Sequence, residues 1–137
     1  MSNVHILDIH RNFIVRSFMS VSQEYLDYVI DQLTAFGPVK SKRMFGGAGL
    51  YLDGFMFGLV SEDMLFFKVD DTNKPDYVSA GTGPFKPFGK DSYEMSYYEV
   101  PGDVLEDPDL LSEWAMKALF AAKRKKPAAA GRARKQQ

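Results

Sequence analysis

The residues of this sequence that could do chemistry begin with Arg43-Met44-Phe45-Gly46-Gly47. A cation stands here beside two bulky apolar side chains, and the paired glycines that follow permit a tight bend. An arginine in that setting can bind an anionic partner or pair with a carboxylate of its own chain. The second is favoured, because many carboxylates of the surrounding chain compete for the cation. This motif is the first place in which we expect function.

Two other patterns imitate ligand sites. Gly47-Ala48-Gly49 resembles the start of a dinucleotide-binding loop, but leucine replaces the third glycine and a strand follows where a helix is required. Residues 71–76 alternate oxygen ligands without the central glycine and final glutamate of an EF-hand. We therefore expect a bulge or close backbone approach at the glycines and helix capping at the acidic segment.

The inventory of catalytic residue types is small. The chain has no cysteine, and its two histidines, His5 and His10, lack acidic or cysteine partners at metal-ligand spacing. The commonest bases and nucleophiles are thus missing from the rest of the chain, which leaves carboxylates such as Glu94 and Glu99, or a lysine. We predict that the protein is not an enzyme, with no catalytic residues, no cofactor and no metal.

The net charge of -1 hides an uneven distribution. Residues 19–122 hold 8 Lys and Arg against 17 Asp and Glu, a net charge of -9, whereas residues 123–137 hold 7 basic residues and no acidic one. Because the acidic part repels a phosphate backbone, only the basic tail is expected to contact nucleic acid. The tail residues concerned are Lys123, Arg124, Lys125, Lys126, Arg132, Arg134 and Lys135.

A β-meander over residues 41–69 must position the glycine motif, and a strand over 39–45 leads into it. Turns at Asp53-Gly54 and Glu62-Asp63 separate runs of alternating apolar residues. The residues that this alternation assigns to a single face are Leu50, Leu52, Phe55, Phe57, Leu59, Leu65, Phe67 and Val69. Two further strands are predicted over 85–88 and 93–100.

Helices flank these strands. A capping box of Ser20 and Gln23 begins the first helix, which Gly37-Pro38 ends, and Asp107-Pro108 begins the last. A short helix closed by Gly81 follows the acidic segment 70–73. The order is α-β-β-β(-β)-α-β-β-α. It predicts a two-layer α+β fold, with helices on one face of an antiparallel sheet of about five to six strands.

The two ends of the chain differ from this folded part, which we place at residues 19–124. Residues 1–18 have no clear period and precede a second Met-Ser, which indicates an appended or disordered leader. After Lys126-Pro127 the composition favours a flexible basic tail, residues 125–137. No apolar run approaches the ~18 residues of a membrane span, and charges interrupt the start. We expect a cytoplasmic protein without membrane contact.

The aromatic residues of the strands are too many for one face of a small sheet. An uncovered remainder would mark a partner or self-association surface, such as a homodimer through the sheet, unless edge loops fold over it. The residues concerned are Tyr51, Phe55, Phe57, Phe66, Phe67, Phe85, Phe88, Tyr93, Tyr97 and Tyr98.

Six motifs taken together closely resemble the N-terminal domain of the TfoX (Sxy) family. They lie between about Tyr25 and Ala122, at 43–47, 49–54, 56–59, 67–70, 95–101 and in the helix of Trp114. The resemblance implies a two-layer α+β fold similar to secretion-chaperone-like domains and no catalytic residues. It also implies a role in bacterial regulation of competence genes, where full-length members act as transcriptional coactivators alongside the cyclic-AMP receptor protein. Those members carry a helical C-terminal domain, and a short Lys/Arg/Ala tail stands at that position here.

These observations favour a non-enzymatic regulatory module that binds another protein, with a second copy as one candidate, through the sheet. The alternative is a nucleic-acid-associated protein that uses the basic tail. A small-molecule-binding domain or an enzyme of unknown class is the third.

Overall fold

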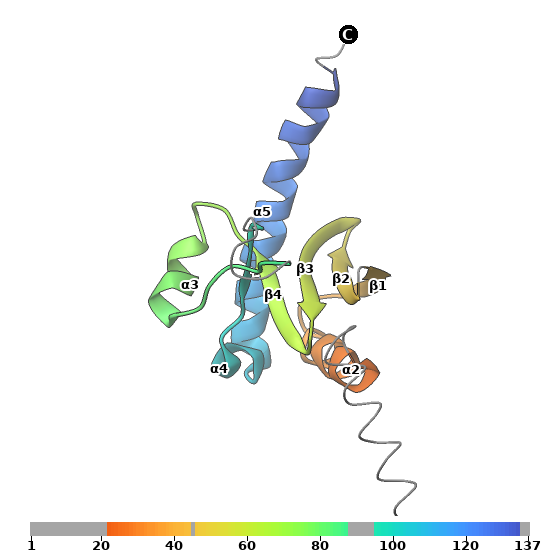
Figure 1. The fold of residues 1–137 in the computed structure, drawn as a ribbon, viewed down its shortest axis with the longest axis vertical. Coiled ribbons are helices and arrows are strands. Elements are labelled where there is room, and N and C mark those ends of the chain that lie inside the picture. The colour runs from red at the N-terminus through yellow and green to blue at the C-terminus, as the bar shows by residue number, and fades with distance from the viewer. Residues whose placement is uncertain (1–21, 45, 88–94, 135–137) are drawn as a thin grey trace, which may run out of the picture.

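The computed structural model describes residues 22–44, 46–87 and 95–134, with the side chains of the last helix described through Lys125 (Figure 1). The helices are α2 (Gln23–Gln32), α3 (Lys74–Ala80), α4 (Gly102–Leu105) and α5 (Pro108–Arg134). The strands are β1 (Lys40–Met44), β2 (Gly47–Leu52), β3 (Phe55–Ser61), β4 (Met64–Lys68) and β5 (Tyr97–Glu99). They form one antiparallel sheet in the order β1-β2-β3-β4-β5, so the α+β prediction is confirmed.

Both predicted hairpin turns are present. Asp53 and Gly54 have φ angles of 55° and 81°, and Glu62 and Asp63 have φ angles of 54° and 58°. Positive φ at both central residues is the signature of the type I′ turn, whose twist matches that of the strands it joins. The second turn holds this conformation without glycine. Asp63 is fixed there because its carboxylate accepts hydrogen bonds from Ser22 N and Oγ at 2.8 and 3.3 Å.

An irregularity in β3 changes which residues share a face. Leu50 pairs with Gly58 but Tyr51 pairs with Met56, so Phe57 is skipped in the register. The extra residue shifts the alternation by one position. Phe57 stays in the core under the helices, whereas Leu59 packs with Phe66 and Tyr97 in a second cluster on the opposite face. The prediction that Leu59 shares a face with Phe57 is therefore wrong.

The first helix is shorter than the sequence predicted. Its N-cap is Ser22, whose Oγ accepts a hydrogen bond from Tyr25 N at 3.2 Å, so the predicted capping box is wrong; Ser20 itself lies outside the described residues. The helix ends at Gln32 and the chain continues in turns to Phe36. At this end the Thr34 hydroxyl donates to the carbonyl of Asp31 at 2.7 Å, a local bond that competes with continued helix.

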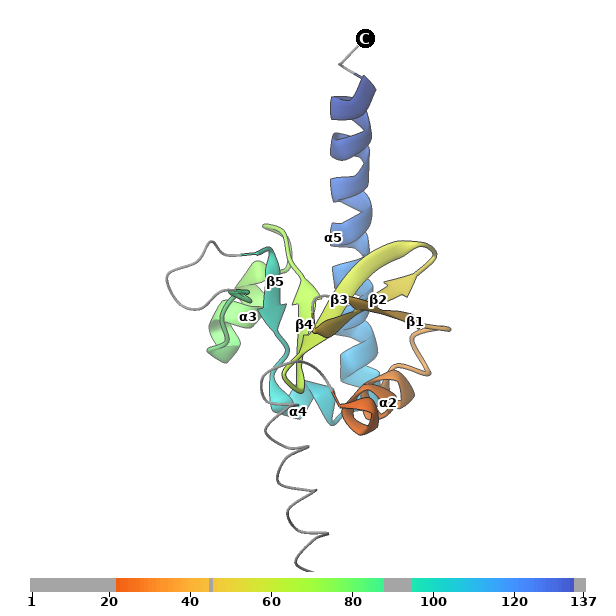
Figure 2. The same cartoon turned by 45° about the vertical axis from the view of Figure 1, so that its right-hand side comes forward.

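All four described helices contribute to one hydrophobic core on one face of the sheet. Figure 2 shows α5 crossing this face, where it packs against β3 and β4. Its buried stripe combines leucine with alanine, and the small side chains let the helix lie close to the strands. The stripe consists of Leu111, Ala115, Ala118, Leu119 and Ala122.

No strand forms at the predicted positions 85–88 within the residues that the structure describes. Pro84 makes an isolated bridge to Tyr98, and Phe85 N donates to Tyr97 O at 2.7 Å. Proline has no N–H to donate, so Pro84 and Pro87 interrupt a strand ladder on this side of β5. The strand predicted over 93–100 shortens to β5, and its first two residues lie outside the described range.

The last helix continues beyond the position where it was expected to end. Its backbone stays helical through Pro127 to Arg134 and extends away from the sheet (Figure 1). Alanine and arginine are strong helix formers, and they dominate residues 128–134. The helical backbone thus reaches into residues 125–137, for which the sequence predicted a flexible basic tail.

Ion pairs stabilise the body half of α5, residues 108–125, against the rest of the domain. Arg124 Nε donates to Asp70 Oδ2 at 2.7 Å, and Lys117 Nζ lies 3.0 Å from Asp76 Oδ2. The hydrogen bond from Arg124 lowers the pKa of Asp70 from 3.8 to about 2. Asp70 also accepts from Thr72 N at 2.9 Å, so this one carboxylate orders the turn before α3 and holds α5 beside it.

Replacing Asp70 with asparagine is expected to lower the free energy of unfolding by about 1 kcal/mol or less near neutral pH, because the pair is partly exposed. The folded pKa lies below the unfolded one, so the contribution of the charge is complete above about pH 4 and is lost as the pH falls toward 2. Denaturant unfolding of both proteins between pH 6 and 2 measures this. The difference between them should shrink steadily toward the acid end, and the exposed neighbour Asp71→Asn is the control. A difference that does not change with pH would contradict the ion pair.

Candidate functional site

The predicted motif at residues 43–47 joins β1 to β2 at one edge of the sheet. Arg43 is exposed, and its Nη2 donates to Oε1 of Gln23 on α2 at 2.8 Å. Met44 is half-buried and pairs with Gly47, while Phe45 lies outside the described residues. Gly46 has a φ of 78°, in the region that favours glycine. The arginine thus links the edge strand to the first helix.

Gly47 and Gly49 both lie in close contact with neighbouring atoms, as expected. A Cβ on Gly47 would lie 2.4 Å from the carbonyl oxygen of Val60, which is backbone and cannot turn aside. A Cβ on Gly49 would lie 3.0 Å from Met44 Cε and 3.2 Å from Met56 Sδ, atoms at the ends of flexible side chains. Because β2 leads directly into β3 without a helix, no helix N-terminus is present to hold a pyrophosphate.

The two edges of the sheet differ. Beside β5, the backbone of 83–85 bonds to the strand, with Glu99 N donating to Gly83 O at 3.0 Å. Beside β1, no strand pairs within the described part of the chain, and Lys40 to Arg43 are all exposed. Met44 and Gly47 flank the two-residue connection of a hairpin, so they form a pair that exchanges both backbone hydrogen bonds, and every second pair along the two strands does the same. Ser41 and Leu50 form one of the intervening pairs, which exchange no backbone hydrogen bonds. The N–H and C=O of Ser41 therefore point away from β2, toward the open edge.

The sheet face opposite the helices carries the second hydrophobic cluster. Phe85 covers Phe66 with ring centroids 4.9 Å apart, and Met56 and Met95 pack around them. Burial raises the pKa of Tyr97 to about 12, and its hydroxyl donates to Met56 O at 3.3 Å. The aromatic excess is thus divided between two faces, and the segment after Gly83 folds over part of the second.

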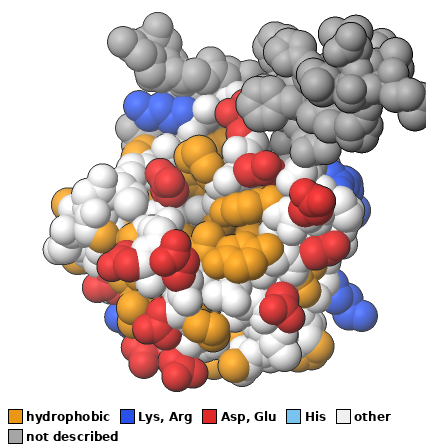
Figure 3. All heavy atoms as spheres, turned by 90° about the horizontal axis from the view of Figure 1, so that it is seen from below, with side chains coloured by type: hydrophobic (Ala, Val, Ile, Leu, Met, Phe, Trp, Pro, Cys, Tyr) orange, Lys and Arg blue, Asp and Glu red, His pale blue; other side chains and the backbone are white. Residues whose placement is uncertain are grey.

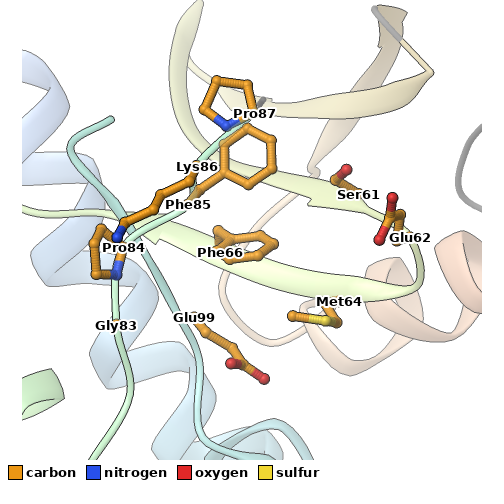
Figure 4. Close-up of a pocket in the computed structure, with 10 residues that line it drawn as sticks. All are labelled: Ser61, Glu62, Met64, Phe66, Gly83, Pro84, Phe85, Lys86, Pro87 and Glu99. Atoms are coloured by element: carbon orange, nitrogen blue, oxygen red, sulfur yellow. The ribbon is translucent and has the colours of Figure 1, made fainter. Parts of the chain in front are cut away.

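Next to this cluster lies a hollow of about 310 Å³ that the sequence did not indicate (Figure 4). Phe66 lies at its centre, with Met64 and Glu99 below it in the view and Glu62 at the far end. Three separate segments form it. The lining residues are Ser61, Glu62, Met64, Phe66, Gly83, Pro84, Phe85, Lys86, Pro87 and Glu99.

The end of the molecule formed by α2 and α4 is acidic. Residues 22–39 and 95–116 together hold nine Asp and Glu and no Lys or Arg. They are brought together because Gln32 Nε2 donates to the Leu105 carbonyl at 2.9 Å. Figure 3 looks onto this end and shows hydrophobic side chains at its centre, surrounded by acidic ones. Burial raises the pKa of Tyr25, at this end of the molecule, to about 12, and the negative charge of Asp63 contributes to the shift.

The residues predicted to contact nucleic acid separate into two groups. Lys123 and Arg124 form ion pairs with the folded part of the chain: Lys123 Nζ lies 3.7 Å from Asp53 Oδ2, and Arg124 pairs with Asp70. Lys125 follows them, exposed, and Lys126, Arg132 and Arg134 continue along the extended half of α5. Lys135 lies outside the described residues.

The described residues contain no group of three or more His, Cys, Asp or Glu that could hold a metal ion. The acidic segment 70–76 instead turns the chain into α3, since buried Asn73 donates to Lys68 O at 3.0 Å and accepts from Asp70 N at 2.8 Å. The predicted side-chain capping of α3 is wrong, because its N-cap residue Asn73 makes no side-chain hydrogen bond to the helix. Within the same residues, none of the helices has the length and apolar character needed to cross a membrane. Residues 1–21 and 88–94 lie outside this description, with both histidines, Glu94 and the predicted leader.

A comparison with protein families matched the TfoX N-terminal domain over residues 31–122. The match spans from the end of α2 to the body half of α5 and includes the whole sheet. A search of curated proteins found no match. Since the family match covers more than half of the chain, the chain belongs to the TfoX N-terminal domain family.

Proposed function

We propose that this member of the TfoX N-terminal domain family is a non-enzymatic regulatory module of the bacterial cytoplasm that acts by binding another protein through its sheet. The connection with transcription and competence comes from the family resemblance alone. The observation that carries the binding proposal is the open edge at β1, beside the motif at residues 43–47. An extended segment of a partner can add to such an edge by backbone hydrogen bonds.

The chemistry of this edge favours a partner over a second copy. Lys40, Lys42 and Arg43 make three of its five residues basic. Two such strands side by side would bring like charges together, which is also how natural sheets prevent edge-to-edge aggregation. A partner strand with acidic side chains has no such penalty.

The experiment compares Ser41→Pro with Ser41→Ala. Proline removes the N–H that points to the open edge and leaves the pairing with β2 in place, whereas alanine removes only an exposed hydroxyl. Proteins retained by the tagged wild type and both variants from native cell extract are quantified by mass spectrometry. We expect a partner kept by wild type and Ser41→Ala and reduced about tenfold with Ser41→Pro, a loss of about 1.4 kcal/mol. The same proteins on all three baits, or none on any, would refute edge binding.

Nucleic-acid binding is the second candidate, because the basic half of α5 extends away from the acidic end (Figure 1). Truncation after Lys125 tests it, since this removes Lys126, Arg132, Arg134 and Lys135 but keeps the ion pairs of Lys123 and Arg124. Salt-dependent binding of duplex DNA that disappears with truncation would support this function. The absence of DNA binding by the intact chain at low salt would exclude it.

A further inference from the structure

We propose that the hollow between β4, β5 and the segment 83–87, defined above by its ten lining residues, binds a lysine- or arginine-bearing apolar segment of a partner protein. This rests on the proposed function and adds a second contact, on the face of the sheet rather than at its edge. The hollow combines an aromatic floor with carboxylates on its rim, and it lies beside the acidic end, whose described residues 22–39 and 95–116 hold no Lys or Arg.

The floor is apolar and already ordered. Phe66 is only 5% exposed and is held by the ring of Phe85, so it can accept a ligand without rearranging. Met64 beside it is 38% exposed, one of few large apolar side chains of the described residues that lie open to this degree. Unbranched methionine adapts to the shape of what it contacts. Floor and rim together can receive the hydrocarbon stem of a long side chain.

The rim is negative. Glu62 stands at the β3–β4 turn and Glu99 on β5, where it pairs with Phe66 across the sheet. Lys86 is the one cation among the lining residues, and in Figure 4 its side chain extends toward Pro84, away from Glu62. A cation in the hollow would gain from charge-assisted hydrogen bonds to these carboxylates.

The surface next to the hollow also favours a positively charged ligand. The turn that carries Glu62 also carries Asp63, which holds the start of α2. The charge of Glu99 acts on Tyr25 of that helix, and the Tyr25 and Tyr28 rings lie 6.3 Å apart. Tyr28 is 40% exposed. The hollow therefore opens beside an acidic end with its own exposed aromatic side chain, which would attract a basic segment and repel an acidic one.

The basic end of α5 from a second copy fits this surface less well. Residues 125–134 offer cations, but their apolar residues are one proline and four alanines. None of these could fill the space over Phe66 and Met64 as a leucine or an aromatic side chain would. An amphipathic partner segment satisfies both the floor and the rim.

The test uses fluorescence anisotropy with a labelled amphipathic peptide of Lys, Arg and Leu, and with oligolysine of equal charge. The double variant Glu62→Gln, Glu99→Gln removes the rim charge. The matched control Asp53→Asn, Asp71→Asn removes two exposed charges at the ends of β3 and β4 opposite Glu62, outside both the hollow and the acidic end. We expect the rim variant to weaken binding of the amphipathic peptide about tenfold and the control less than about twofold, with oligolysine binding weakly. Thermal unfolding confirms that both variants fold.

Four outcomes would overturn the inference. They are no binding of the amphipathic peptide, equal loss with the control variant, equal affinity for oligolysine, and a concentration-dependent increase in mass of the chain alone that Met64→Ser abolishes. Failure here is separable from failure of the proposed function. In the anisotropy assay, Ser41→Pro should bind the peptide as tightly as the wild type does. If no peptide bound at all, the loss of a partner from the Ser41→Pro bait would still support edge binding.

Discussion

Replacing Gly47 with alanine is expected to lower the free energy of unfolding by about 3 kcal/mol, at the upper end of what overpacking usually costs. The added Cβ would lie 2.4 Å from the carbonyl oxygen of Val60, in the strand-to-strand contact of β2 with β3. A side chain in this position could rotate away, but a carbonyl oxygen moves only if the strands separate. Denaturant unfolding, followed by far-ultraviolet circular dichroism, measures the loss.

Two other glycines provide a graded control. Gly49→Ala meets no backbone, only the side-chain atoms Met44 Cε, Tyr51 Cε1 and Met56 Sδ at 3.0 to 3.2 Å, so we expect a loss of about 1 kcal/mol. Gly102→Ala, at the first residue of α4, meets nothing within 4 Å and should change stability by less than about 0.5 kcal/mol. Equal effects at Gly47 and Gly102 would show that the close approach at Gly47 does not matter.

Local patterns predicted the elements of this fold well. Two adjacent turn residues between runs of alternating apolar residues are a short-range signal, and both hairpins form where the signal stands. Asp107-Pro108 likewise marks the start of α5, and Asp107 Oδ1 accepts from Leu110 N at 3.2 Å. Such features depend on residues within a few positions of one another, so the sequence alone contains them.

The errors arise where distant residues decide. Ser22 rather than Ser20 caps α2 because Asp63, 41 positions away, receives Ser22 as a hydrogen-bond donor. The hollow needs β4, β5 and residues 83–87 together, and no segment alone indicates it. The acidic end is similar, since its two segments meet only after folding. Of the predicted site residues, Arg43 and Met44 end the edge strand β1 and Gly47 begins β2, while Lys126, Arg132 and Arg134 of the basic tail lie on the extension of α5.

The bulge in β3 is the clearest case, because one skipped residue reverses the faces of a whole strand. Strict alternation would put Phe57 and Leu59 on one side of the sheet. Instead Phe57 lies under the helices and Leu59 on the far face. Gly58, directly after Phe57, is the one local sign of a bulge, since a glycine inside a strand often marks one, but the alternation of apolar residues around it favours a regular strand.

Replacing Phe57 with alanine is therefore expected to have the largest effect in this chain, a loss of about 4 kcal/mol in the free energy of unfolding. Its side chain is fully buried, and its ring lies 5.1 Å from Phe36 and 5.7 Å from Phe67, centroid to centroid. Truncation opens a cavity between two layers that cannot close around it. If the alanine variant is too unstable to measure, Phe57→Leu keeps much of the volume and should lose about 1.5 kcal/mol or less.

Double-mutant cycles test the assignment of faces independently of these magnitudes. Phe57 and Phe67 touch across the core, so replacing both with smaller side chains should give a coupling energy above about 0.5 kcal/mol. Leu59 and Phe67 lie on opposite faces, so Leu59→Ala and Phe67→Leu should add within that limit, whereas Leu59 and Phe66 should couple. Coupling of Leu59 to Phe67 instead of Phe66 would mean that the strand alternates regularly and that the bulge is absent in solution.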